Sequence, residues 1–320
     1  MFKEIIGWSM AAVVGLSACT LEKFEDEEEK ESGVSPYIDK VWEYHPAPGQ
    51  FINTGYSGAT IENPHPTYEQ ILETLTKGFK GKANGSLVTL GGFGGYIVVG
   101  FDHMVVNSRG DYDFKVYGNA FWGWEAKNPN GGSCEPGIIE VMHDANGNGL
   151  PDDEWYEIAG SDYSHPETVH GYEITYFRPG SGQPDTIRWV DNQGQTGCID
   201  YLPEYHTQMY YPEWYTGEIA DSVTFRGTKV RNTAIEESGK GTYWVLYALD
   251  WGYVDNYPNE LEQSNIKISW AVDKEGNPVD LPGIHFVRVY TGQNQKCGWL
   301  GETSTELGGM EDLHPRMTAE

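Results

Sequence analysis

Short runs of alternating apolar and polar residues recur along most of the chain, and Gly, Pro, Asn or Asp separate them. In one run, Ile266, Ile268 and Trp270 share one face and the residues between them are polar, as in an antiparallel strand with one side on a core. Frequent turns between short runs are typical of all-β folds. The pattern predicts strands over residues 87–90, 96–102, 113–117, 137–143, 155–159, 172–177, 186–190, 222–226, 243–249, 266–272 and 284–290.

One segment has the spacing of a short helix instead. Thr67 can cap its start, and Gln70 stands three residues later, which is the spacing of a capping box. Gly78 marks its expected end. The residues predicted to form its apolar face are Ile71, Leu72, Leu75 and Phe79.

The glycine-rich segment 91–95 lacks the Lys-Ser/Thr pair of a phosphate-binding loop, so we expect tight turns and close strand packing there. No repeat recurs at a fixed period, which argues against a propeller. The composition does not change between Pro36 and Leu313. We therefore expect one antiparallel, jelly-roll-like β-sandwich with long loops over residues 36–320, and a split near Tyr201 is the alternative.

Composition supports this prediction and narrows the partners. The 320 residues include 40 Gly, 11 Trp, 21 Tyr and 11 Phe, which favours turns and sheets over a helical bundle. There are 21 Lys and Arg against 48 Asp and Glu, which gives a formal net charge of −27. Such a negative field repels phosphate backbones, so we expect no nucleic-acid partner.

The N-terminal residues have the features of an export signal. Lys3 precedes an apolar stretch, and small residues precede Cys19. This segment resembles a lipoprotein signal peptide over residues 1–18, with lipid attached to the Cys19 thiol. The acidic run that follows predicts an extended tether over residues 19–35, and it resembles the surface-export signal of Bacteroidetes lipoproteins. We expect a lipid-anchored protein on the extracellular face of an outer membrane.

Three further cysteines, Cys134, Cys198 and Cys297, follow Cys19. No two of them have the spacing of a zinc knuckle, so we expect no zinc site. An exported protein tolerates disulfides, and one pair could form and leave one free thiol. The sequence does not choose among the pairings.

The segment 144–155 has the most specific chemical pattern. Oxygen-bearing side chains at its first, third and fifth positions and glycine at the sixth match the start of an EF-hand-type calcium loop. Trp155 stands where that loop has a bidentate Glu, so Glu154 or Glu157 would have to supply the contact. We expect a structural calcium ion, and the alternative is an ion-free Asn/Gly turn. The predicted ligands are Asp144, Asn146, Asn148, Leu150 through its carbonyl, Asp152, Asp153 and Glu154.

Aromatic residues gather in predicted loops. Flat rings with polar edges suit a sugar face or a planar cofactor. Core packing is the alternative, and we expect it for Trp244 and Trp270 within predicted strands. The residues expected to bind a ligand are Trp122, Trp124, His206, Tyr210, Tyr211, Trp214, Tyr215, Trp251 and Tyr253.

The sequence contains no recognisable catalytic pattern. It has no Gly-x-Ser-x-Gly motif, no His-Glu-x-x-His helix and no kinase motifs. His165, Glu167 and His170 are close in sequence but match no zinc motif, so we expect a surface loop there. We therefore expect a protein without enzymatic activity.

Several segments together point to a family. They are GGYIVVGFD (94–102), DFKVYGNAF (113–121), 144–160, WGYVDN (251–256), SWAVD (269–273) and GWLGETSTE (298–306). These segments resemble cell-surface lipoproteins of Bacteroidetes, and the similarity extends over about residues 37–313. Such relatives resemble accessory proteins encoded beside TonB-dependent transporters, including loci for vitamin B12 capture. The resemblance implies a non-catalytic ligand binder.

The leading hypothesis is therefore a surface lipoprotein that holds a small nutrient, first of all a corrinoid such as vitamin B12, for a TonB-dependent outer-membrane transporter. The aromatic loops would cover the corrin; His206 could ligate cobalt, although an ordinary surface histidine is favoured. The alternative is a carbohydrate-binding module whose Trp122, Trp124 and Trp214 stack on sugar rings. A third hypothesis is a glycoside-active enzyme that uses acids near those rings.

Overall fold

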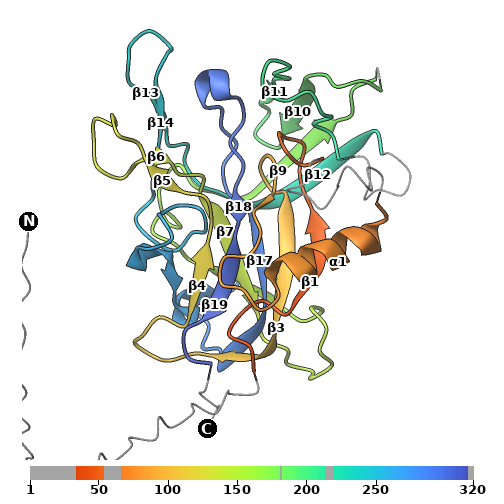
Figure 1. The fold of residues 1–320 in the computed structure, drawn as a ribbon. Helices are drawn as coiled ribbons and strands as arrows, with labels where there is room; N and C mark the ends of the chain where they lie inside the picture. The colour runs from red at the N-terminus through yellow and green to blue at the C-terminus, as the bar shows by residue number, and fades with distance from the viewer. Residues whose placement is uncertain (1–33, 54–65, 181, 213–219, 316–320) are drawn as a thin grey trace, which may run out of the picture. The chain divides into compact units, whose positions relative to one another are not determined.

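The computed structural model describes residues 34–53, 66–180, 182–212 and 220–315. Within these ranges it contains nineteen β-strands but a single α-helix, α1 (Tyr68–Phe79), so the all-β prediction is confirmed (Figure 1). No helix in this part of the chain is long and apolar enough to span a membrane. The predicted signal peptide, Cys19 and nearly all of the predicted tether lie outside the described residues.

The largest sheet has six antiparallel strands with a largely buried, apolar centre. In sheet order they are β1 (Lys40–His45), β3 (Tyr96–Val106), β17 (Gly283–Thr291), β7 (Gly137–Met142), β8 (Trp155–Ile158) and β16 (Ala271–Val272). β17 pairs with β3 on one side and with β7 on the other. Figure 1 shows β1, β3, β17 and β7 side by side, with α1 next to β1.

The other strands described form four smaller antiparallel sheets. One has the order β11 (Thr196–Ile199), β10 (Ile187–Asp191), β9 (Val169–Phe177) and β12 (Ser222–Lys229). Another has the order β13 (Ala234–Glu236), β14 (Trp244–Tyr247), β6 (Gly131–Ser133) and β5 (Phe121–Trp122). The two smallest are β15 (Asn265–Ile266), β4 (Phe114–Tyr117) and β19 (Gly309–Asp312), and the pair β18 (Glu306–Leu307) and β2 (Val88–Thr89).

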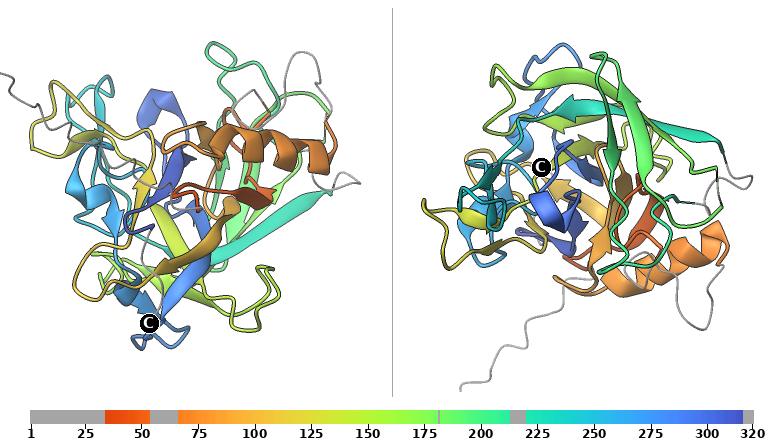
Figure 2. Two further views of the ribbon diagram at one scale, coloured as in Figure 1. Left: turned by 60° about the horizontal axis from the view of Figure 1, so that its bottom comes forward. Right: turned by 90° about the horizontal axis from the view of Figure 1, so that it is seen from above.

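Two hydrophobic cores lie on opposite faces of the six-stranded sheet. Because side chains alternate along a strand, Val287 and Val289 enter the first core while Tyr290 enters the second. The first core also takes the buried face of α1, and the second takes the inner face of the β9–β12 sheet. In Figure 2 the long green and teal strands of that sheet lie apart from the yellow and orange strands of the central sheet.

The structure confirms the predicted helix and its capping box. The Thr67 hydroxyl accepts a hydrogen bond from Gln70 N at 3.3 Å, and Thr67 N donates to Gln70 Oε1 at 3.0 Å, which closes the capping box. Gly78 lies inside the last turn rather than after it, since the helix ends at Phe79. Three of the four predicted apolar-face residues are fully buried, and Leu72 packs partly buried against the same core.

Two finer predictions are wrong. The predicted strand over 266–272 is broken, because the 3-10 helix η3 (Ile268–Trp270) separates β15 from β16 and leaves Trp270 half-buried. The expected jelly-roll sandwich has two packed sheets, whereas the described strands divide among five. The four larger sheets suggest a propeller-like ring of unequal blades instead. The absence of a sequence repeat could not exclude such a ring, because its sheets differ in length.

The glycine-rich segment makes the predicted tight turns and close contacts. Gly91 has φ +72°, and a Cβ atom there would collide with the carbonyl oxygen of Ala47. Gly94 has φ +84° and lies against the Phe225 side chain in the same way. These positions therefore need glycine both for backbone conformation and for space.

We expect Gly91→Ala to lower the free energy of unfolding by about 3 kcal/mol or more, because left-handed strain adds to a backbone collision. Gly194 has φ +79° and no atom within 4 Å of an added Cβ, so Gly194→Ala carries the conformational cost alone. That control should lose about 1–2 kcal/mol. Urea unfolding of both variants measures the difference, and equal losses would contradict the close approach at Gly91.

Candidate functional site

Three aromatic rings line a hollow of about 400 Å³, which we call the Trp251 hollow. The ring centroids of Trp251 and Trp270 are 4.4 Å apart, and the Tyr112 ring meets Trp270 edge-on at 6.1 Å. Trp251 is 37% exposed, so a large part of an indole is open to solvent. The volume falls within the range of about 300–1,000 Å³ that is usual for small-molecule sites.

Polar side chains complete the lining of the Trp251 hollow. The Asn265 Oδ1 atom is buried without a hydrogen-bond partner among the described residues. Lys267 Nζ lies 4.8 Å from the centre of the Tyr112 ring and donates to the Gly110 carbonyl at 3.3 Å. The polar lining residues are Asp250, Glu262, Gln263, Asn265 and Lys267. The hollow therefore offers flat apolar rings together with hydrogen-bonding groups, which is the usual composition of a ligand site.

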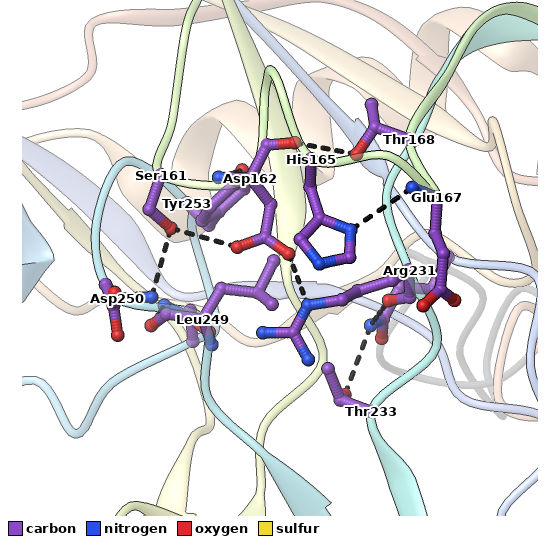
Figure 3. Close-up of polar contacts among 12 residues, drawn as sticks. Ser161, Asp162, His165, Glu167, Thr168, Arg231, Thr233, Leu249, Asp250 and Tyr253 are labelled. Atoms are coloured by element: carbon purple, nitrogen blue, oxygen red, sulfur yellow. Dashed lines mark hydrogen bonds and ion pairs between the residues drawn. The ribbon is translucent and has the colours of Figure 1, made fainter.

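A hydrogen-bonded turn fixes the backbone of Trp251, and Figure 3 shows its contact between Ser161 and Asp250. The Ser161 hydroxyl accepts hydrogen bonds from Asp250 N at 3.1 Å and from Trp251 N at 3.4 Å. Ser161 N in turn donates to the Trp251 carbonyl at 3.0 Å. The backbone that bears the exposed Trp251 ring is thus hydrogen-bonded to the turn that follows β8. This reduces the entropy lost when a ligand binds.

The same turn is anchored in the interior by Asp162. Its carboxylate accepts a hydrogen bond from Arg231 Nε at 2.5 Å, and its backbone N donates to the Tyr253 hydroxyl at 3.0 Å. Thr168 Oγ1 donates to the Asp162 carbonyl at 2.7 Å. Because Asp162 is buried and Arg231 half-buried, removing either partner would leave a poorly solvated charge.

Several of the rings predicted to bind ligand belong to the interior instead. Tyr210 and Tyr211 are fully buried in the second core, and Tyr253 is 2% exposed. Their polar edges are used internally: the Tyr210 hydroxyl accepts from Leu202 N at 3.4 Å, for example. These tyrosines shape the core rather than an exposed binding surface, so this part of the site prediction is wrong.

The remaining predicted rings have mixed positions. Trp122 is half-buried and meets Tyr257 edge-on at 5.3 Å. Trp124 is completely exposed in the turn between β5 and β6. His206 packs edge-on against Phe51 at 4.1 Å, and burial lowers the pKa of its imidazole. The predicted residues Trp214 and Tyr215 lie outside the described residues. Among the predicted rings that the structure describes, only Trp251 lines the Trp251 hollow.

The predicted calcium loop is an exposed turn between β7 and β8, in which carboxylates accept hydrogen bonds from the loop itself. The Asp144 carboxylate accepts from the backbone N of Gly147, Asn148 and Gly149 at 2.8–3.1 Å. The Asp152 carboxylate accepts from the side-chain amides of Asn146 and Asn148 at 3.0–3.2 Å. The loop thus brings hard oxygen donors together, the type that calcium prefers.

Other predicted ligands of this loop differ in their contacts. Asp153 accepts from the backbone N of Ala145 and Asn146, and the Leu150 carbonyl accepts from Asp152 N at 2.9 Å. Glu154 instead accepts a hydrogen bond from the Tyr156 hydroxyl at 3.0 Å. Glu157, the alternative twelfth-position ligand, accepts from Thr228 Oγ1 at 2.6 Å, and burial raises its pKa to about 7. The carboxylates of Glu154 and Glu157 are therefore hydrogen-bonded to residues outside the loop.

A second acidic group was missed by sequence reasoning. Carboxylate oxygens of Glu135, Asp255 and Glu306 lie within 4.8 Å of one another, although the three residues are far apart in sequence. Asp255 has φ +55° and accepts from Asn119 N at 2.5 Å and from Glu306 N at 2.9 Å. No local sequence pattern around these three acids indicates a cluster, because only the tertiary fold brings them together.

Burial controls the protonation of this acidic group. Burial, together with the neighbouring carboxylates, raises the pKa values of Glu135 and Glu306 well above the ordinary range. Burial also raises the pKa of Asp255 to about 6. Carboxyls this close share protons at neutral pH, because all three cannot ionise together without a cation.

The pH dependence of stability follows with a definite sign. In the unfolded chain these carboxyls release their protons near pH 4–4.5, whereas in the folded chain they keep them to higher pH. The folded state therefore binds more protons, and the free energy of unfolding falls as pH rises, by about 1.4 kcal/mol per pH unit for each proton retained. We expect a lower Tm at pH 8 than at pH 5.5 in EDTA, measured by calorimetry.

Glu306→Gln isolates the contribution of this cluster, because glutamine cannot ionise. The variant should show a smaller fall in Tm between the two pH values than the parent protein. His103, whose pKa is raised by its hydrogen bond to Asp312, contributes with the same sign but equally in both proteins. A pH dependence identical in parent and variant would show that the cluster does not titrate as described.

The histidines and cysteines considered in the sequence analysis do not come together in the structure. His165 Nδ1 accepts from Glu167 N at 3.2 Å, whereas His170 contacts Thr228 and the Tyr163 carbonyl, so the two rings have separate partners. Cys134, Cys198 and Cys297 are all free thiols, the first and third buried and Cys198 exposed. The disulfide considered from the sequence is not formed among them.

No protein-family model and no curated protein matches the chain.

Proposed function

We propose that this chain is a non-catalytic binding protein that captures a small nutrient in the Trp251 hollow. The observation that carries the proposal is the pair of indole rings, Trp251 and Trp270, held 4.4 Å apart beside the unpaired Asn265 Oδ1 atom. Fixed rings suit recognition because little side-chain freedom is lost on binding.

The first ligand proposed is a corrinoid, as the resemblance to Bacteroidetes surface lipoproteins implies. A corrinoid presents a flat face for the indoles and amide arms for groups such as Gln263 and Asn265. The second is a glycan, which the combination of rings and hydrogen-bonding side chains in one hollow also favours. Either ligand would extend beyond a volume of about 400 Å³, so the hollow would hold one part of it.

The cellular placement is proposed from sequence alone. Lipid on Cys19 and the acidic tether would hold the binding domain on the extracellular face of the outer membrane. From there the ligand would pass to a TonB-dependent transporter, the partner that the resemblance implies. The net charge of −27 keeps such a domain away from anionic surfaces.

Calorimetric titration with cyanocobalamin and a panel of neutral polysaccharides tests the function. We expect one class to bind, and Trp251→Ala to weaken it at least tenfold, since removing an aromatic anchor costs about 1.4 kcal/mol or more. Trp299→Ala is the matched control, because Trp299 is 48% exposed and does not line the hollow. The absence of binding by every ligand tested, or an equal loss of affinity in both variants, would contradict the proposal. Turnover of a chromogenic glycoside would favour an enzyme instead.

We also propose that calcium binds in the loop of residues 144–153. Asp144 and Asp152 supply carboxylates, while Asn146 and Asn148 could turn their amide oxygens inward. Glu154 is left out of this ligand set because of its bond to Tyr156. The ion would brace the connection between β7 and β8 without any catalytic role.

Removal of calcium should lower the Tm, because an ion that binds only the folded state stabilises it, by about 2.7 kcal/mol at a hundredfold excess over Kd. Differential scanning fluorimetry of calcium-loaded and EDTA-treated protein measures this shift at constant pH. Asp144→Asn should abolish most of the difference. If loaded protein and chelated protein melt together, the loop is an ion-free turn.

A further inference from the structure

A second, smaller cleft lies beside Trp189, away from the residues of the Trp251 hollow. It has a volume of about 170 Å³ and draws its walls from β10, β11, the segment after β12 and the segments after β17. We call it the Trp189 cleft. A dry protein cavity of about 150 Å³ accommodates benzene, so this volume holds one six-membered ring with few substituents.

The lining of the Trp189 cleft is too polar for a hydrocarbon ring. It contains four side-chain amides, the Thr303 hydroxyl and the Glu302 carboxylate beside the Trp189 ring. The amides belong to Asn232, Gln293, Asn294 and Gln295. A ring with hydroxyl groups on its edge and C–H groups on its faces meets both kinds of surface.

Part of this polar wall is fixed by internal hydrogen bonds. Gln295 Nε2 donates to Gln293 Oε1 at 2.7 Å, and Gln295 Oε1 accepts from Thr233 N at 2.8 Å. Gln293 Nε2 donates to the Arg231 carbonyl at 2.7 Å. Because their amides are already paired, these two glutamines act as a rigid wall rather than as the main ligand contacts.

Other polar groups in the cleft remain available. Asn294 Nδ2 donates to the Tyr172 hydroxyl at 3.0 Å, which leaves its Oδ1 as an acceptor. The side chains of Asn232 and Thr303 form no hydrogen bond with the part of the chain that the structure describes. Together they supply donors and acceptors around the opening, as a ring of hydroxyls requires.

Glu302 adds a fixed acceptor. Gln50 N donates to its Oε1 at 2.5 Å and Gln50 Nε2 to its Oε2 at 2.9 Å, so the carboxylate is held while further lone pairs remain. Burial raises the pKa of this carboxyl to about 7. The other charged lining residues, Asp200 and Lys296, form an ion pair with each other. An anionic ligand would face Glu302 without a free cation, so the cleft favours a neutral one.

We propose that the Trp189 cleft binds a single six-membered ring of a neutral sugar, packed against the Trp189 indole and hydrogen-bonded by Asn232, Asn294, Thr303 and Glu302. The proposal concerns a separate site and does not depend on which ligand occupies the Trp251 hollow. The cleft could hold a free monosaccharide or the end of a longer glycan, since both present the same ring.

Saturation-transfer NMR and calorimetry with methyl glycosides of glucose, galactose, mannose and N-acetylglucosamine test the proposal, with glucuronate as the anionic comparison. We expect at least one neutral glycoside to bind, and glucuronate at least tenfold more weakly. Trp189→Ala and Asn232→Ala should each weaken binding at least fivefold. Asn232 is exposed, so its replacement leaves the fold intact even if Trp189→Ala does not.

Matched controls come from outside the cleft. Phe121→Ala removes another exposed ring and Glu260→Gln another exposed carboxylate, and both should bind like the parent protein. Glu302→Gln should weaken binding, whereas Glu260→Gln should not. Three results would overturn the proposal: no neutral glycoside binds, glucuronate binds as tightly, or the loss occurs in Trp251→Ala and not in Trp189→Ala. The last result would assign the sugar to the Trp251 hollow.

Discussion

Burial of the six-stranded sheet on both faces is the constraint on which the rest of the structure depends. β3 and β17 are buried at most positions, on both faces, so neither face of these strands can be left to water. One face is covered by α1 and the smaller sheets, and the other by the β9–β12 sheet. The loops that form the candidate site emerge from the strands that this double burial fixes in place.

That constraint explains how exposed rings can be held still. Trp251 follows β14 and lies against the turn after β8, where Ser161 and the buried Asp162–Arg231 pair join three segments. The backbone of a solvent-exposed indole is thus anchored to buried residues. Internal hydrogen bonds hold the lining of both the Trp251 hollow and the Trp189 cleft. Paired glutamines fix the wall of the Trp189 cleft, as Ser161 fixes the Trp251 backbone.

Local signals in the sequence were sufficient for local structure. The capping pair Thr67 and Gln70 fixed the start of α1, and alternating apolar runs located most long strands to within a few residues. The partition into sheets was not predictable in this way, because strands of two residues such as β5 and β18 have no periodicity to detect. Their pairing is decided by long-range contacts alone.

The site was predictable only in part, for a related reason. Trp251 was a predicted ligand residue because aromatic residues cluster around it, but Tyr210 and Tyr211 share that local composition and are core residues. Exposure is a property of the tertiary fold, so composition could not separate them. Trp270 was expected in the core, and it packs half-buried against the first core while it also lines the Trp251 hollow. Glu135, Asp255 and Glu306 meet only through the fold.

The position of β17 in the chain has a consequence for the order of synthesis. This strand joins β3 to β7 at the middle of the large sheet, yet it is made after nearly every other strand. A growing polypeptide that lacks it leaves two half-sheets with unpaired edges and no common interior. We therefore expect the large sheet to complete its strand pairing only late in translation, after β17 has been made.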